Sequence, residues 1–258
     1  MLRRKRKRKY IVAVLLFLFL GINAPVCVQA APLIQTTTLQ SDFEALTYLE
    51  LMQTPVLKQP NLQQAYENVW QTTVKIQGEH YFASGSIWKI TQDQIVIVTN
   101  KHVLEYYDEN SVILFFNGRV EKGEKLGAAA QIDAGFLTVD TSLFSYEELL
   151  QMRSVRPVVL AWEQVEAGTE FFLIDMVSDV YAPKCYEGTV LEKLGHIEEW
   201  NEDMMLGAAY GRPGMSGSGV FDDYGNYIGM LTGGTGENQI ASLPVNKVIE
   251  AYGEVQIE

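Results

Sequence analysis

A serine flanked by glycines near the end of the sequence is the short segment with the clearest chemical potential. Residues 214–219 read GMSGSG, so Ser216 follows Gly214 closely and directly precedes Gly217. Glycines permit a tight turn and leave backbone N–H groups uncovered beside the hydroxyl. A nucleophilic hydroxyl next to bare N–H donors suits acyl transfer, because the donors stabilise the oxyanion of the transition state. Glycine and serine clusters also mark ordinary turns, which is the alternative interpretation.

Two further segments carry groups that would activate such a serine. His102 follows an apolar run that ends in VTN at 98–100, and Asp133 stands just before another apolar run. Histidine can accept the serine proton, and a carboxylate can fix the tautomer of the ring. The chain has 3 histidines, and neither His80 nor His196 has comparable surroundings.

The order His102, Asp133, Ser216 separates this pattern from other serine hydrolases. An α/β-hydrolase places the serine first, within G-x-S-x-G, and a subtilisin-like enzyme places the aspartate first. The run here has Ser218 where G-x-S-x-G requires glycine. Asp140 is an alternative acid, but Asp133 has the better position, at the start of a predicted strand.

At these residues the chain resembles the trypsin-like serine proteases of the chymotrypsin fold, and VTNKHV at 98–103 is similar to the bacterial HtrA-type branch. The resemblance covers roughly residues 65–250. It implies an all-β fold of two six-stranded antiparallel β-barrels with a C-terminal helix. It also implies that Ser216 is the nucleophile, His102 the general base and Asp133 the residue that orients the imidazole.

The resemblance also assigns an oxyanion hole to the backbone N–H groups of Gly214, Met215 and Ser216. The chymotrypsin branch has aspartate at the position of Met215 and the HtrA branch usually has asparagine, so this chain departs from the family at a side chain that can brace the loop. Just before the loop stands Arg212, which faces either the substrate groove or solvent.

The same comparison predicts the substrate pocket. Tyr210 occupies the position at which a trypsin carries its pocket aspartate, so specificity for Arg or Lys is not expected. Thr232, Gly233 and Gly234 would form one wall of the pocket and pair with the substrate backbone. The resemblance implies that the pocket accepts small or medium aliphatic side chains of the substrate.

The N-terminus has the three-part layout of a secretory signal. Lys and Arg fill positions 3–9, an apolar run follows at 11–22, and VQAA at 28–31 offers a cleavage site after Ala30. An uncleaved membrane anchor over residues 10–28 is the alternative, because this stretch is nearly long enough to span a bilayer. We therefore expect export across a bacterial cytoplasmic membrane, to the cell envelope or beyond.

Composition excludes several classes of partner. The 258 residues carry 20 Lys and Arg against 32 Asp and Glu, a formal net charge of −12, and the basic residues are concentrated in the signal. A nucleic-acid ligand is therefore not expected. Beyond Cys27 in the signal the only cysteine is Cys185, so no intramolecular disulfide is expected. Nothing in the pattern of Cys and His implies a metal site, and no cofactor is implied.

The remaining chain divides into a leader over 31–65 and a protease domain over 66–258. In the helical leader, 32–40 is predicted to be a flexible tether before helices at 41–52 and 61–70. Short apolar runs with frequent turn residues predict strands at 72–77, 81–90, 94–99, 112–116, 136–139, 170–176, 186–192, 204–209, 219–221, 227–232 and 241–245. They place one barrel at about 66–150 and the other at about 157–245. The sequence stops at Glu258, so the PDZ domain of many HtrA-type proteases is not expected.

The predicted function is that of an exported serine endopeptidase, acting on protein or peptide substrates through an acyl-enzyme intermediate. A secreted, non-catalytic protein-binding module on the same fold is the alternative from another class. An esterase with the same three residues also remains open, because acyl transfer to water is shared chemistry.

Overall fold

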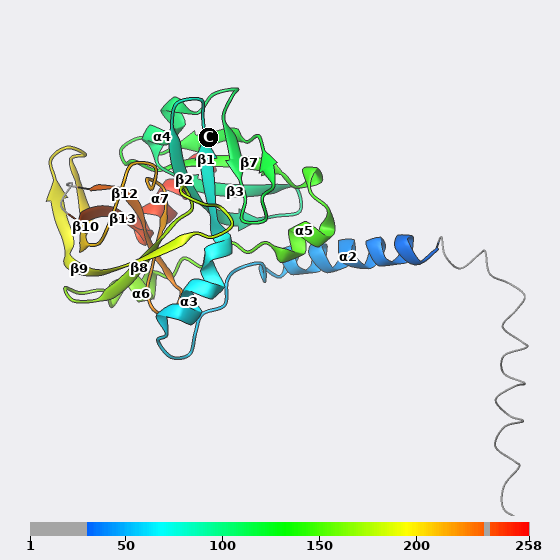
Figure 1. The fold of residues 1–258 in the computed structure, drawn as a ribbon, viewed down its shortest axis with the longest axis horizontal. Coiled ribbons are helices and arrows are strands. Elements are labelled where there is room, and N and C mark those ends of the chain that lie inside the picture. The colour runs from blue at the N-terminus through cyan, green and yellow to red at the C-terminus, as the bar shows by residue number, and fades with distance from the viewer. Residues whose placement is uncertain (1–29, 235–237, 258) are drawn as a thin grey trace, which may run out of the picture.

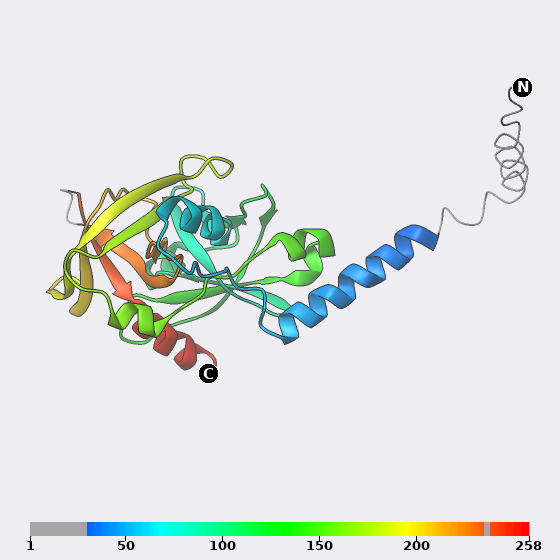
Figure 2. The same ribbon diagram turned by 90° about the horizontal axis from the view of Figure 1, so that it is seen from below.

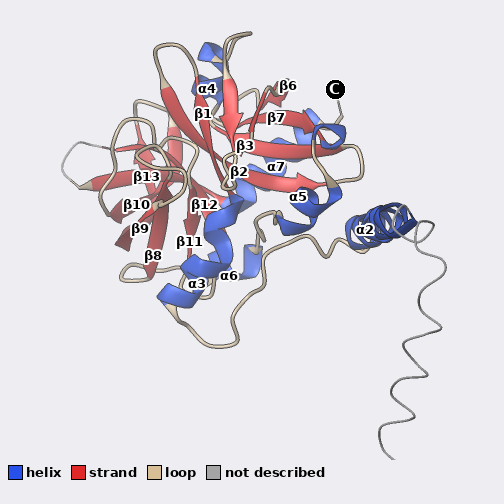
Figure 3. Cartoon of the chain, turned by 45° about the vertical axis from the view of Figure 1, so that its right-hand side comes forward, coloured by secondary structure: helices blue, strands red, loops and turns tan. Residues whose placement is uncertain are grey.

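Two antiparallel β units form the body of the molecule, and a few helices pack around them (Figures 1 and 3). The structure, a computed structural model, describes residues 30–234 and 238–257. Seven strands build the first sheet: β1 Thr73–Gln77, β2 Phe82–Ile90, β3 Gln94–Thr99, β4 Val112–Leu114, β5 Val120–Glu121, β6 Glu124–Ala128 and β7 Gly135–Asp140. Their order across the sheet is β5-β4-β1-β2-β3-β7-β6.

The second unit is a closed barrel of six strands: β8 Glu170–Asp175, β9 Lys184–Ile197, β10 Glu202–Ala208, β11 Gly219–Phe221, β12 Tyr227–Gly234 and β13 Gln239–Pro244. Hydrogen bonds close it in the order β10-β13-β12-β11-β8-β9. The all-β class is confirmed. The prediction of six strands in each unit is corrected for the first, which has seven. Two of those, β5 and β6, are short and have no fully buried residue, so they give no apolar signal in the sequence.

The helices lie at the surface and at the two ends of the described chain. They are α2 Ala30–Tyr48, α3 Leu62–Val69, α4 Lys101–Tyr106, α5 Tyr146–Gln151, α6 Val159–Glu163 and α7 Val245–Val255. The closing helix α7 matches the predicted C-terminal helix, and α3 matches the predicted second leader helix. The side chain of Asn61 caps α3 by accepting a hydrogen bond from the Gln64 N–H at 3.0 Å.

The prediction of a flexible tether at 32–40 is wrong, because α2 runs through it without a break. Figure 2 shows this helix extending away from the β units. Its C-terminal half is anchored where Phe43, 1% exposed, meets Tyr146 of α5 with ring centroids 6.0 Å apart. From this anchored end the helix continues through polar residues that have no strong helix propensity of their own.

Among the described residues, no helix is both long and apolar enough to cross a bilayer. The predicted signal or anchor falls almost wholly within residues 1–29, which lie outside the described residues.

An aromatic cluster joins the two β units. Trp88 of β2 contacts Phe136 of β7, Tyr227 of β12 and Tyr252 of α7, with ring centroids 6.5, 5.8 and 5.9 Å away. Phe136 and Tyr227 are fully buried. Packed aromatic rings bury large apolar areas and prefer such tilted geometries. The relative position of the two units is therefore fixed by dense packing and by α7, which lies across both.

Candidate active site

The pairing of β3 with β7 brings His102 and Asp133 together. Thr99, the last residue of β3, pairs with Gly135, the first residue of β7, so the segments that carry the two side chains leave the sheet at the same edge. Oδ2 of Asp133 lies 2.8 Å from Nδ1 of His102, and Oδ1 accepts the His102 backbone N–H at 2.9 Å. Asn100 Nδ2 donates to the Asp133 carbonyl oxygen at 3.0 Å. The carboxylate thus fixes both the backbone and the ring of the histidine.

Asp133 is more deeply buried than its partner His102. The Asp133 side chain is 10% exposed, whereas the His102 side chain is 39% exposed. Because Nδ1 faces the carboxylate, Nε2 is the ring atom left to exchange a proton with another group. This arrangement has the geometry of a base oriented by an acid.

The other candidate groups lie elsewhere. Asp140 sits at the opposite end of β7, where its Oδ1 accepts the Ser142 N–H at 2.7 Å and caps a short turn. His196 pairs with Asp203 at 3.0 Å on an exposed hairpin. His80 is exposed beside Glu79.

Ser216 belongs to the second unit, on the loop that leads into β11. Its Oγ donates to the Thr232 carbonyl oxygen at 3.3 Å. Its carbonyl oxygen accepts the N–H of Ser84, on β2 of the first sheet, at 2.8 Å. Within the described residues no hydrogen bond links Ser216 Oγ to the ring of His102.

Two glycines allow the loop to turn as it does. Gly214 has φ +96° and Gly217 has φ +89°, a region that favours glycine. The N–H groups of Gly214 and Ser216 have no hydrogen-bond acceptor within the described chain, so they are free to hold an anion. Met215 was predicted to contribute too, but its N–H donates to the Arg212 carbonyl oxygen at 3.1 Å. Of the three predicted donors, two are therefore left without an acceptor in the described chain.

A cavity of about 340 Å³ opens beside Ser216. The described residues that line it are Gly211, Arg212, Pro213, Ser216, Leu231, Gly233, Gly234, Asn238 and Gln239. Gly233 and Gly234, two of the residues predicted to bind substrate, are among those that line this cavity. A Cβ on Gly233 would lie 2.6 Å from the Trp200 ring, so a larger residue does not fit there.

Two other residues predicted to bind substrate have different surroundings. Tyr210 is not among the described residues that line the cavity. Its ring packs at a tilt against that of Tyr186 on β9, with centroids 4.7 Å apart, a contact that its position in the sequence does not indicate. Thr232 does not line the cavity either, although its carbonyl oxygen accepts from the Ser216 hydroxyl.

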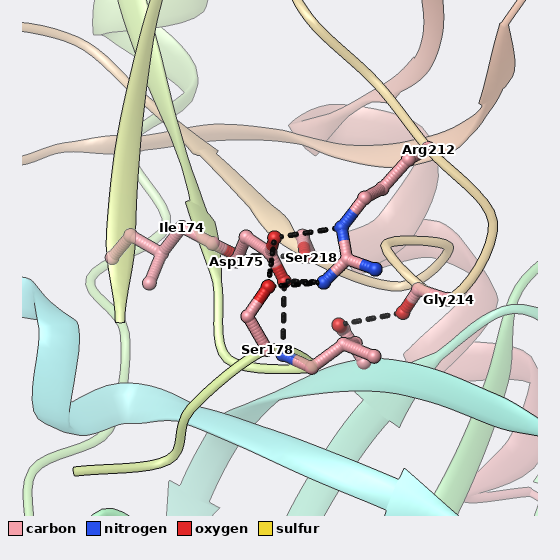
Figure 4. Close-up of polar contacts among 8 residues, drawn as sticks. Ile174, Asp175, Ser178, Arg212, Gly214 and Ser218 are labelled. Carbon is pink, nitrogen blue, oxygen red and sulfur yellow. Dashed lines mark hydrogen bonds and ion pairs between the residues drawn. The ribbon is translucent and has the colours of Figure 1, made fainter. Parts of the chain in front are cut away.

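Arg212 lines the cavity beside Ser216, and its guanidinium is held in an ion pair. Figure 4 shows its guanidinium against Asp175, the last residue of β8. Nε and Nη2 donate to the two carboxylate oxygens at 2.9 and 3.1 Å. The hydrogen bond that Arg212 donates to Asp175 raises the pKa of Arg212 above its ordinary value. Asp175 was not among the predicted residues, although a carboxylate at the end of an otherwise apolar strand is a signal of a buried partner.

No cluster of His, Cys, Asp and Glu side chains in the described chain could hold a metal ion.

The trypsin-like peptidase domain family matches residues 83–230, a span that includes His102, Asp133 and Ser216. The chain belongs to this family. No curated protein matches it by sequence. The match begins in β2 and ends in β12, so it takes in strands from both β units of this trypsin-like peptidase.

Solved structures share the fold of this trypsin-like peptidase at low sequence identity. The HtrA-type protease AlgW with a tripeptide is 16% identical, with a TM-score of 0.63 over 76% of this chain and 64% of that one. Rv3671c from M. tuberculosis H37Rv, in an inactive form, is 14% identical, with a TM-score of 0.59 over 79% and 97%. The serine endoprotease from Yersinia pestis is 16% identical, with a TM-score of 0.59 over 76% and 67%. The chain thus spans less than two thirds of the AlgW chain.

The close fit around Gly217 yields a test of the loop. A Cβ on Gly217 would lie 2.0 Å from the Ser84 carbonyl oxygen, and φ is +89°. We expect Gly217→Ala to lower the free energy of unfolding by about 3 kcal/mol or more, measured by urea denaturation. Gly168→Ala is the matched control, because Gly168 has φ +94° with nothing within 4 Å of the added Cβ. It should cost only the backbone strain, about 1–2 kcal/mol. Equal losses in the two variants would contradict the close contact.

Proposed function

We propose that this trypsin-like peptidase is an active serine endopeptidase that works outside the cytoplasm. The observation that carries the proposal is the clamp of Asp133 on both the ring and the backbone N–H of His102, at 2.8 and 2.9 Å. The Ser216 loop, with free N–H groups at Gly214 and Ser216, supplies the complementary half of the site.

In the proposed reaction, His102 Nε2 takes the proton of the Ser216 hydroxyl as Oγ attacks the substrate carbonyl carbon. The hydroxyl must first turn from the Thr232 carbonyl oxygen toward the ring, and such hydrogen bonds commonly tighten only when substrate is bound. The N–H groups of Gly214 and Ser216 stabilise the negative oxygen that results.

The leaving amine then takes the proton from His102, and the peptide bond breaks to leave an acyl group on Ser216 Oγ. Water attacks this ester with His102 again as base, and the proton returns to Oγ as the acid product departs. Asp133 stabilises the imidazolium in both halves of the reaction and itself stays ionised. Each step uses only groups that this chain carries.

The cavity beside Ser216 supports a preference for uncharged side chains. Its described lining includes Leu231 and the amides of Asn238 and Gln239, and no carboxylate that would pair with Arg or Lys of a substrate. The guanidinium of Arg212 is already neutralised by Asp175. We propose that the enzyme accepts small to medium uncharged residues before the scissile bond.

The basic and apolar segments at the N-terminus support the proposed location. The run of Lys and Arg at 3–9, the apolar run at 11–22 and the small residues at 28–31 together form an export signal.

We expect a fluorophosphonate probe to label the purified protein at Ser216 and to leave Ser216→Ala unlabelled. Loss of the nucleophile should lower turnover of a peptide substrate by about 10⁶-fold, with circular dichroism unchanged. A folded wild-type protein that binds peptides but is neither labelled nor able to cleave them would instead be a binding module on this fold.

The two aspartates near β7 give a second test. Asp133→Asn should lower kcat by about 10⁴-fold, because the amide holds His102 in the wrong tautomer. Asp140→Asn is the matched control, since Asp140 only caps a turn at the far end of the strand. It should leave kcat within about twofold and cost at most ~1 kcal/mol of stability. The reverse pattern would reassign the acid.

The proposed location can be tested on the protein produced in a bacterial host. N-terminal sequencing of the exported form should begin at Ala31, because a signal peptidase favours the small residues before it. Recovery of a membrane-bound species with residues 1–30 intact would establish the anchor in place of the cleaved signal.

A further inference from the structure

Asp175 is a fully buried carboxylate at the end of β8, with 0% of its surface exposed. Its oxygens accept hydrogen bonds from Arg212, from the Val177 N–H at 2.9 Å and from Ser178 Oγ at 3.3 Å. Figure 4 shows Ser178, from the β8–β9 connection, and Arg212, from the loop before Ser216, both against the carboxylate of Asp175. Burial of a charge is costly in free energy unless the charge is paired and hydrogen-bonded. The buried carboxylate of Asp175 therefore holds these donor groups in place around it.

The Arg212 end of the pair is directly joined to the oxyanion loop. Its carbonyl oxygen accepts the Met215 N–H at 3.1 Å, which closes a tight turn around Pro213 and Gly214. The two parallel bonds to Asp175 fix the direction of the guanidinium as well as its position. The start of this turn is therefore tied to β8 rather than free to rotate.

Val177, whose N–H is bonded to Asp175, also contacts the same turn. A Cβ on Gly214 would lie 3.2 Å from Val177 Cγ1, so the valine side chain lies against the glycine backbone. On the other side of the turn, Ser84 Oγ donates to the Gly214 carbonyl oxygen at 3.0 Å. Asp175 thus holds both Arg212, at the start of the turn, and Val177, which packs against Gly214.

Position 215 supplies no polar side-chain brace for the turn. The Met215 side chain is fully buried among apolar side chains and carries no hydrogen-bonding group that could hold the turn. We propose that Asp175 is a positioning residue that replaces such a brace, keeping the N–H groups of Gly214 and Ser216 aimed at the oxyanion through Arg212 and Val177. The inference rests on the proposed function, and Asp175 itself does not line the substrate cavity.

The test compares Asp175→Asn with wild type in peptide hydrolysis and in binding of a peptide boronic acid, which forms a tetrahedral adduct on the serine. Misplacement of oxyanion donors by about 1 Å costs on the order of 10²-fold. We expect kcat to fall by about that factor with KM within about threefold, and boronate affinity to fall in parallel with kcat/KM.

A double variant separates positioning from stability. Asp175→Leu together with Arg212→Met removes both charges and keeps apolar volume, a replacement that often preserves the stability of a buried ion pair. We expect its urea midpoint to stay near that of wild type while kcat remains about 10²-fold low. Recovery of full kcat along with stability would overturn the proposal, because the pair would then be only structural. This variant also keeps the test open if Asp175→Asn does not fold.

Asp222→Asn is the matched control on the same barrel. Asp222 is 9% exposed and accepts hydrogen bonds from Tyr224 N, Asn226 N and Asn226 Nδ2 at 3.0, 2.8 and 2.7 Å, but it lies in the β11–β12 hairpin. It should lower stability and leave kcat within about twofold. A loss of kcat equal to that of Asp175→Asn would show a general effect of buried carboxylates and would contradict the proposal.

The amide resonances of Gly214 and Ser216 distinguish failure of this inference from failure of the proposed function. If wild type is folded but unlabelled by a fluorophosphonate, the proposed enzyme is wrong, and the loop is then judged by its NMR spectrum. Asp175→Asn should shift or broaden both resonances, whereas Asp222→Asn should not. The role of Asp175 would be overturned if Asp175→Asn left both resonances unchanged. It would also be overturned if wild type is active and Asp175→Asn is labelled by the fluorophosphonate as fast as wild type.

Discussion

A backbone contact across the two β units, centred on Ser84, is the constraint on which the geometry of the site depends. Ser84 is fully buried in β2, and its N–H donates to the Ser216 carbonyl oxygen at 2.8 Å. Its hydroxyl holds the Gly214 carbonyl oxygen, and its own carbonyl oxygen accepts from Thr99 Oγ1 at 2.7 Å. Because the loop is bonded to the first sheet at two points, the Ser216 segment of the barrel is held beside the sheet that carries His102 and Asp133.

The donor and acceptor groups of the buried Ser84 all have partners, which makes the contact specific as well as stabilising. A buried donor or acceptor left without a partner costs about 1–3 kcal/mol. A shift of the barrel against the sheet would leave several of these groups without partners at once. The aromatic rings of Trp88, Phe136 and Tyr252 oppose the same shift by packing. Hydrogen bonds therefore set the register of the two units, and aromatic burial supplies the attraction between them.

The sequence predicted best the strands in which almost every residue is buried. The runs at 94–99 and 219–221 are strands with the predicted bounds, because every residue of the second and nearly every residue of the first is buried. The predicted helix at 41–52 corresponds to the end of α2, whereas the start of α2 over 30–40 and strands β5 and β6 were missed. Residues 36–40 are mostly exposed, and β5 and β6 contain no buried residue, so no apolar pattern marks them. The sequence singled out Ser216, His102 and Asp133 by their neighbours, and the pairing of β3 with β7 brings the last two into contact.

Contacts between distant residues were beyond such reasoning. Ser84 looked like an ordinary strand serine, Asp175 like the end of a strand, and Tyr210 like a pocket residue by its distance from Ser216. Their surroundings depend on which loops meet at the junction: Tyr210 turns to Tyr186 on β9, and Arg212 turns to Asp175 on β8. Spacing along one segment carries no information about such partners.

The division of the site between the units has a physical consequence. His102 and Asp133 lie at the same end of one sheet, where the pairing of β3 with β7 fixes their separation, so their contact is made within the first β unit. The Ser216 loop has two glycines at positive φ and a buried methionine in place of a polar brace, so its shape must be imposed by Ser84 from one side and Asp175 from the other. Of the two halves, the loop is the one whose conformation depends on the whole molecule being assembled. Ser216 and the N–H groups beside it therefore take the positions seen here only when both β units are folded and docked.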